Sequence, residues 1–192
     1  SDHMKASFGD SKYARTCSSF FGMGTPMEND ANTDWFKGGQ NFAKAKALAK
    51  TADKPGLRVE ATDDLEAAVR QADIVSAATL STEPLVRGAW LKPGAHVDLV
   101  GAYSPDRRES DDEAVCRARV YVDTRAGATK EGGDVVQPLK SGVLKPADIR
   151  GDLLELARGQ AKGRATPEEI TLFKSVGASL EGGFHQRVFR RA

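Results

Sequence analysis

The sequence AHVDLVGAYSPDRRE, residues 95–109, decides the fold. Its first part is a short apolar run that follows Lys-Pro-Gly at 92–94 and ends at Gly101, where a polar turn containing Pro105 begins. A β-branched and apolar run of this length predicts a buried strand rather than a helix, which would need more residues. Because open parallel sheets bind ligands beyond the carboxyl ends of their strands, we expect function just past Gly101.

Strands and helices alternate on both sides of this stretch. Apolar runs predict strands at 73–79, 95–100, 119–123 and 170–174. Amphipathic spacing and capping residues predict helices that begin near Asn41, after Asp64 and at Ser110. This alternation is typical of βαβ units with right-handed crossovers, so we predict an α/β fold with a mostly parallel sheet and helices on both faces.

Composition narrows the classes of function. The chain has 192 residues, of which 40% are hydrophobic and 29% are charged, and its formal net charge is +1. Such a chain can bury one good core, and its interspersed charges predict neither a nucleic-acid nor a membrane partner. Cys17 and Cys116 form no disulfide framework and no zinc-ligand spacing, so we expect a cytoplasmic protein with no metal site. Residues 1–3 precede Met4 and resemble an expression-vector remnant.

Residues 4–40 form an atypical N-terminal arm, rich in Ser, Gly, Asn and Asp and poor in Leu, Ile and Val. Within it, residues 17–21 are a candidate strand, followed by Gly22-Met23-Gly24 and by a helix start at residues 25–28. A strand, a G-x-G turn and a helix start make half of a dinucleotide-binding fingerprint, but the third glycine is absent. Both readings therefore stay open, a phosphate cradle and a plain turn.

Small and hydroxyl-bearing residues follow each of the predicted strands. On a parallel sheet these exits share one edge, where small residues let a flat ring or a pyrophosphate approach the backbone. The alternative is that they only turn the chain. At the last exit, residues 175–177, we expect exposed backbone amides. The exits comprise Thr79, Leu80, Ser81, Gly101, Ala102, Tyr103, Ser104, Asp123, Thr124, Lys174, Ser175 and Gly177.

Three polar features of the strands and turns have alternative readings. His96 is expected to be a hydrogen-bonded packing residue rather than a catalyst. Asp123 ends a predicted strand, where its carboxylate either binds substrate or caps the next helix. The charged run from Asp106 to Glu109 is interpreted as a solvated turn. No Ser-His-Asp spacing, P-loop, zincin motif or paired CxxC is present, so no catalytic residue is assigned.

Four segments together resemble the ornithine cyclodeaminase/mu-crystallin family, in the correct order and over about residues 41–180. They are ADIVSAAT at 72–79, WLKPGAHVDLVGA at 90–102, RRE at 107–109 and EEITLFKSVG at 168–177. The resemblance implies a Rossmann-type NAD(P)-binding domain over residues 41–181, a homodimer, and hydride transfer to amino acids or cyclic imines. It also implies that the nicotinamide side of the cofactor site is lined by Thr79, Gly101, Ala102, Tyr103, Lys174, Val176 and Gly177.

The chain departs from that family in ways that shape the expected function. Tyr103 stands where the cyclodeaminases carry an aspartate, which favours the branch that reduces cyclic ketimines of the pyrroline- or piperideine-2-carboxylate type. The N-terminal substrate domain, the first Rossmann strand and its glycine-rich turn have no counterpart before Asn41, and residues 182–192 are a basic tail. Two functions are therefore carried forward. One is an NAD(P)H-dependent imine reductase impaired by truncation, and the other is a non-catalytic Rossmann half that binds or oligomerises.

Overall fold

The computed structural model describes residues 40–52 and 59–177. The candidate strand and G-x-G turn of the N-terminal arm, and the basic tail, lie outside these residues. The strands are β1 (Ile74–Ala77), β2 (His96–Leu99), β3 (Ala118–Val122), β4 (Ile149–Asp152) and β5 (Ile170–Lys174). The helices are α3 (Gln40–Ala52), α4 (Leu65–Gln71), η3 (Gly88–Trp90), α5 (Asp112–Arg117), α6 (Arg125–Ala128), α7 (Gly133–Ser141), η4 (Pro146–Asp148) and α8 (Leu153–Ala157).

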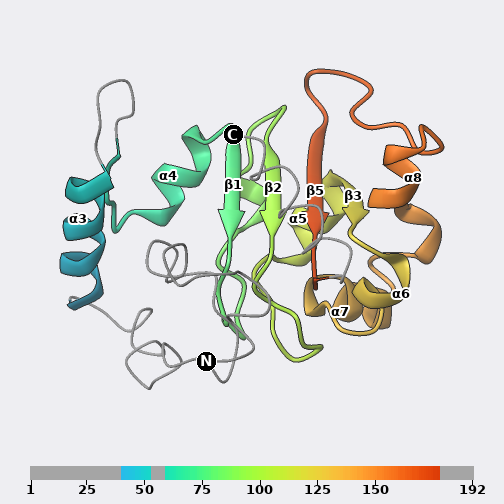
Figure 1. Cartoon of the computed structure of the whole chain (residues 1–192), viewed down its shortest axis with the longest axis horizontal. Helices are drawn as coiled ribbons and strands as arrows, with labels where there is room; N and C mark the ends of the chain where they lie inside the picture. Colours follow the sequence, from blue (N-terminus) through green and yellow to red (C-terminus); the bar gives the residue numbers. More distant parts are fainter. Residues whose placement is uncertain (1–39, 53–58, 178–192) are drawn as a thin grey trace, which may run out of the picture.

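All five strands run parallel in one sheet with the order β1-β2-β5-β3-β4. The predicted α/β fold of Rossmann type is confirmed. Figure 1 shows the arrows of β1, β2 and β5 pointing the same way, toward the edge where α6 and α7 lie. β5 is the last of the described strands in sequence yet lies between β2 and β3, so the residues that follow it join the loops of its two neighbours at the centre of the sheet.

Most of the core lies on one face of the sheet, which we call the Val97 face. It contains Val97, Leu99, Val120, Val122 and Leu172, each at most 1% exposed. Residues of α4, α5 and α7 (Val69, Val115 and Val135) complete the same cluster. This burial follows from the strand period of two, because each apolar residue on this face alternates with a residue on the opposite face.

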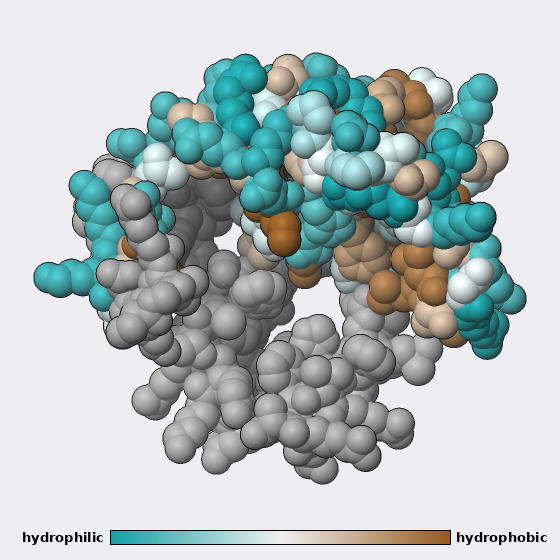
Figure 2. Space-filling view, turned by 90° about the horizontal axis from the view of Figure 1, so that it is seen from above, coloured by the Kyte–Doolittle hydropathy of each residue, from teal (hydrophilic) through white to brown (hydrophobic). Residues whose placement is uncertain are grey.

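The opposite face, which we call the His96 face, is more polar, and the described residues cover only part of it. It carries His96, Asp98, Tyr121, Thr171 and Phe173, and Leu156 of α8 adjoins it in an open depression of about 230 Å³. His96 is hydrogen-bonded as expected, with Nδ1 2.8 Å from Thr171 Oγ1. In the view from above in Figure 2, apolar residues gather on the right, the side on which Figure 1 places β3 and α8.

Candidate functional site

The carboxyl ends of four strands are level with one another. The register pairs Ala77 with Leu99, Leu99 with Lys174, and Lys174 with Val122. The segments that leave these strands therefore meet at one edge, which we call the carboxyl edge. Thr79 follows β1, residues 101–103 follow β2, and residues 175–177 follow β5. The sequence prediction that these exits gather at one edge is confirmed.

The carboxylate of Glu109 lies between the first two of these loops. Its Oε1 accepts a hydrogen bond from the backbone N–H of Thr79 at 2.5 Å, and its Oε2 accepts from Gly101 N–H at 2.8 Å and from Ala102 N–H at 3.3 Å. The side chain is fully buried. The interpretation of residues 106–109 as a solvated turn is therefore wrong at its last residue, because Glu109 folds inward to pair amides that would otherwise be buried without partners.

Glu109 is in turn held by Asp134, at the start of α7. Asp134 Oδ1 accepts hydrogen bonds from Glu109 N–H at 2.9 Å, from Ser110 N–H at 2.8 Å and from the Ser110 hydroxyl at 2.9 Å. Asp134 Oδ2 makes no hydrogen bond within the described part of the chain but lies 3.6 Å from Nζ of Lys174. Both side chains are completely buried, so a charged chain of contacts runs from the β1 and β2 loops through α7 to β5.

Burial and charge act against each other in this cluster. Removal from water raises the pKa of Glu109, while the Thr79 N–H and the Lys174 ammonium lower it and Asp134 raises it. Removal from water lowers the pKa of Lys174, and the carboxylates of Asp134 and Glu109 raise it. The Lys174 ammonium donates to the carbonyl of Leu99 at 3.3 Å and points into the protein. Lys174 therefore supports the carboxyl edge from inside and does not present its charge there.

A second carboxylate, Asp123, holds the turn after β5. Its Oδ2 accepts from Val176 N–H and Gly177 N–H, each at 2.9 Å, and from the Ser175 hydroxyl at 3.3 Å. The expectation of exposed amides at residues 175–177 is therefore wrong. Asp123 accepts from Val176 N–H and Gly177 N–H, and the Leu99 carbonyl accepts from Ser175 N–H at 3.0 Å. The helix-cap reading of Asp123 is also wrong, since α6 is capped by the Thr124 hydroxyl, which accepts from Gly127 N–H.

Close packing and open space alternate along the carboxyl edge. A Cβ added to Gly101 would overlap the backbone of Thr79 and the Glu109 carboxylate, so only glycine permits this approach of the two loops. Gly177 has φ +88°, and no atom of the described residues lies within 4 Å of the place where a Cβ would stand. Among the described residues, the buried hydroxyl of Tyr103 meets no hydrogen-bond partner. Within the described residues, the carboxyl edge thus combines closely packed loops, space beside Gly177 and a buried hydroxyl without a partner.

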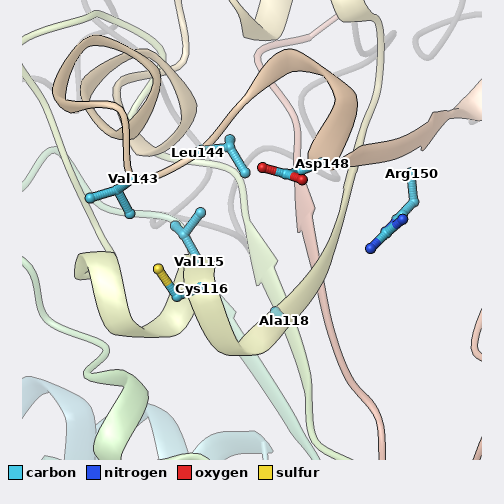
Figure 3. Close-up of a pocket in the computed structure, with 7 residues that line it drawn as sticks. All are labelled: Val115, Cys116, Ala118, Val143, Leu144, Asp148 and Arg150. Carbon is cyan, nitrogen blue, oxygen red and sulfur yellow. The ribbon is translucent and has the colours of Figure 1, made fainter.

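A separate pocket of about 250 Å³ lies at the opposite edge of the sheet, near the starts of β3 and β4. Figure 3 shows it between Val115 and Cys116 of α5, the residues that follow α7, and Asp148 and Arg150. It contains none of the predicted site residues. Within residues 40–52 and 59–177, no group of three His, Cys, Asp or Glu side chains could hold a metal ion.

The sequence matches the ornithine cyclodeaminase/mu-crystallin family over residues 39–188. It is 41% identical over 136 residues to a Delta(1)-pyrroline-2-carboxylate reductase of Paracoccus denitrificans, a match that covers 71% of this chain and 43% of that protein. The chain belongs to the ornithine cyclodeaminase/mu-crystallin family. Within the family it is also 42% identical over 123 residues to the ketimine reductase mu-crystallin of Mus musculus, covering 64% of this chain and 36% of that protein.

Solved structures of the family and its neighbours share the fold. The Delta(1)-pyrroline-2-carboxylate reductase of Thermococcus litoralis, solved in complex with NADH and L-proline, superposes with a TM-score of 0.70 at 34% identity. That match covers 79% of this chain and 46% of that one. An archaeal alanine dehydrogenase dimer with bound NAD superposes with a TM-score of 0.67 at 26% identity. The chain spans less than half the length of these family relatives.

Glu109 and Asp134 are the two residues of the site that sequence reasoning missed. Glu109 ends the charged run DRRE, which is typical of a solvated turn, and Asp134 precedes Val135 and Val136. A carboxylate at the start of an apolar helix was the available signal, because such a side chain is buried with the helix unless the chain turns it out. The sequence does not indicate that Glu109 contacts Thr79, 30 positions earlier, or that Asp134 contacts Glu109, 25 positions earlier.

Proposed function

We propose that this chain is the nicotinamide-binding part of an oxidoreductase that uses NAD(P)H to reduce a cyclic imine amino acid of the pyrroline- or piperideine-2-carboxylate type. Support comes from membership of the family and from relatives that are named pyrroline-2-carboxylate and ketimine reductases. We assign the cofactor surface to Thr79, Gly101, Ala102, Tyr103, Lys174, Val176 and Gly177, with Lys174 acting from the interior.

The observation that best supports this proposal is that the protein's own carboxylates accept hydrogen bonds from the backbone amides at the carboxyl edge. Glu109 takes the amides of Thr79, Gly101 and Ala102, and Asp123 takes those of Val176 and Gly177. A pyrophosphate is bound by free amides and positive charge, which these loops do not offer. A neutral nicotinamide ring and its ribose need a firm, small-residue surface, which they do offer, so the edge fits that end of the cofactor.

The reaction requires the ring and the imine to be held face to face. When bound, the reduced nicotinamide supplies a hydride to the carbon of the C=N bond, while the nitrogen takes a proton, and a cyclic amino acid results. This chain's loops contribute orientation and exclusion of water, and misplacement by about an ångström costs about a hundredfold in rate. Tyr103 in place of the cyclodeaminase aspartate favours this reduction over ornithine cyclisation.

The alternative function is that of a non-catalytic Rossmann half that binds a dinucleotide or oligomerises. The proposed domains are the binding domain at 41–181, the arm at 4–40 and the tail at 182–192. We further propose a homodimer that works in the cytoplasm with a small cyclic imine or amino acid as its ligand. Among the described residues, no helix is long and apolar enough to cross a membrane.

Titration with NADH and with NADPH, followed by nicotinamide fluorescence, tests the proposal. We expect saturable binding in the micromolar range, followed by oxidation of the cofactor when pyrroline- or piperideine-2-carboxylate is added. Binding without turnover would support the non-catalytic alternative. No binding up to about 1 mM, which corresponds to roughly 4 kcal/mol, would contradict both functions that depend on the dinucleotide.

A matched pair of variants locates the binding surface. Thr79→Val removes a hydroxyl at the carboxyl edge without changing the shape of the side chain, and we expect it to weaken NADH binding several-fold, in line with about 0.5–1.5 kcal/mol for one hydrogen bond. Thr82→Val makes the same change at an exposed position three residues away and should leave the affinity unchanged. Equal affinities in both variants would place the nicotinamide elsewhere.

A further inference from the structure

The loops after β1 and β2 are joined through one side chain. Three backbone N–H groups, two from one loop and one from the other, converge on the two carboxylate oxygens of Glu109. We propose that Glu109 is the positioning residue of the nicotinamide site, which fixes Thr79 against Gly101 and Ala102 without touching the cofactor. The inference rests on the proposed function and adds a residue to it.

A carboxylate is the side chain suited to this position. An ionised carboxylate is an acceptor only, with room for several donors on its two oxygens. A glutamine of the same shape would keep one acceptor oxygen and turn its NH₂ group toward at least one N–H of the loops. One of the two loops would then lose its attachment, and a buried donor would be left unpaired.

The position of Glu109 is itself determined by the elements behind it. The N–H groups of Glu109 and Ser110 both donate to Asp134 Oδ1, so the backbone that carries the carboxylate is attached to the first turn of α7. Nζ of Lys174, 3.6 Å from Asp134 Oδ2, offsets part of the buried negative charge. Through Glu109, Asp134 and Lys174, the β1 and β2 loops are linked to β5. The turn after β5 forms the other side of the proposed cofactor surface.

Each of the two carboxylates at the carboxyl edge binds the amides of different loops. Glu109 holds Thr79, Gly101 and Ala102, whereas Asp123 holds Val176 and Gly177. No hydrogen bond links Glu109 to the turn after β5 within the described residues. Loss of the Glu109 carboxylate should therefore release the first pair of loops and leave the turn after β5 in place, which distinguishes local positioning from general support of the fold.

Amide hydrogen exchange measured by NMR on the whole chain tests this, with Glu109→Gln compared with Glu113→Gln. Glu113 is an exposed glutamate four residues further on, so the control makes the same chemical change outside the site. We expect Glu109→Gln to raise the exchange rates of Thr79, Gly101 and Ala102 at least tenfold and to leave those of Val176 and Gly177 within twofold. In the control, all five rates should match the wild type.

Cofactor titration gives the second readout. We expect Glu109→Gln to raise the Kd for NADH at least tenfold and to leave the Kd for ADP-ribose, which lacks the nicotinamide ring, within twofold. If Glu109→Gln does not fold, Glu109→Asp, which keeps the charge but is shorter by one methylene, should give the same pattern with smaller changes.

Three results would overturn the assignment of Glu109. One is unchanged exchange at Thr79 and Gly101, and another is an equal rise at Val176 and Gly177, which would indicate general loosening. The third is a Kd for NADH within twofold of that of Glu113→Gln. If the wild type binds neither NADH nor NADPH, the proposed function fails, whereas the exchange pattern still decides whether Glu109 fixes the two loops.

Discussion

The ammonium of Lys174 is fully buried, 3.6 Å from Asp134 Oδ2 and 3.3 Å from the carbonyl of Leu99. Glu109 and Asp134 are fully buried as well. Burial lowers the pKa of Lys174, and the carboxylates of these two residues, together with that of Asp123, raise it. Removing one partner of a buried ionic group costs more than the pair itself contributes, because the remaining charge is left in a medium of low dielectric constant.

We predict that Lys174→Met lowers the free energy of unfolding by about 3–5 kcal/mol at neutral pH. Lys174 lowers the pKa of Glu109, so its loss raises that pKa further above the unfolded value. The folded variant then binds more protons than the unfolded chain, and its stability rises as pH falls through the raised pKa. Urea unfolding should therefore show a deficit relative to wild type that is smaller at pH 5 than at pH 8.

Lys140→Met, at an exposed position near the end of α7, is the matched control and should have a small effect at both pH values. A deficit for Lys174→Met that stays constant between pH 5 and pH 8 would mean that the nearby carboxylates do not respond to the loss of the ammonium.

At the scale of elements, the site depends on how closely the loops after β1 and β2 lie side by side beyond the last paired residues of these strands. Ala77 pairs with Leu99, and Val100 N–H still donates to the Ala77 carbonyl at 2.8 Å. Gly101 then lies against the backbone of Thr79, where no side chain fits. The loops of the two strands therefore behave as one unit, fastened by the Glu109 carboxylate.

We predict that Gly101→Ala separates these loops, because the new methyl group overlaps the Thr79 backbone and displaces the Glu109 carboxylate. Overpacking of this kind costs about 1–3 kcal/mol, and NADH binding should be lost along with it. Thermal unfolding and NADH fluorescence measure the two effects. Gly163→Ala, where a methyl group meets nothing within 4 Å, should behave as the wild type in both measurements.

At the largest scale, the core is one-sided within the part of the chain that the structure describes. There, residues of α4, α5 and α7 pack on the Val97 face of the sheet, whereas part of β1 on the His96 face is exposed, with Ile74 at 68%. Hydrophobic stabilisation scales with the apolar area removed from water, so most of it comes from the Val97 face. The stability of the described residues is therefore concentrated in a single layer between the sheet and three helices.

We predict that two Leu→Ala substitutions differ sharply because of this asymmetry. Leu172→Ala, in the centre of β5 with no exposed surface, should lower the free energy of unfolding by about 2–5 kcal/mol. Leu154→Ala, on α8 with 51% exposure, should change it by about 0.5 kcal/mol or less. Chemical denaturation measures both. Comparable losses would show that α8 carries an equal share of the core.

Much of the fold was predictable because its strands have a strong local pattern. The runs around Val75, Val97, Val120 and Leu172 are short, apolar and bounded by turns, and each forms a strand near the expected bounds. β4 was missed, since Ile149-Arg150-Gly151-Asp152 contains one apolar residue and reads as a turn. It becomes a strand only because β3 supplies a hydrogen-bonding neighbour.

The sequence by itself determined the parallel α/β architecture, the gathering of the strand exits at one edge and the family. These follow from periodicity and from motifs that are local in the chain. Only the tertiary structure decided that Glu109 and Asp123 occupy the amides of that edge and that Lys174 points inward. Glu109 reaches Thr79 30 positions away, Asp123 reaches Val176 53 positions away, and Lys174 reaches Leu99 75 positions away. Such contacts arise because folding buries donors that must find an acceptor wherever the packed chain brings one.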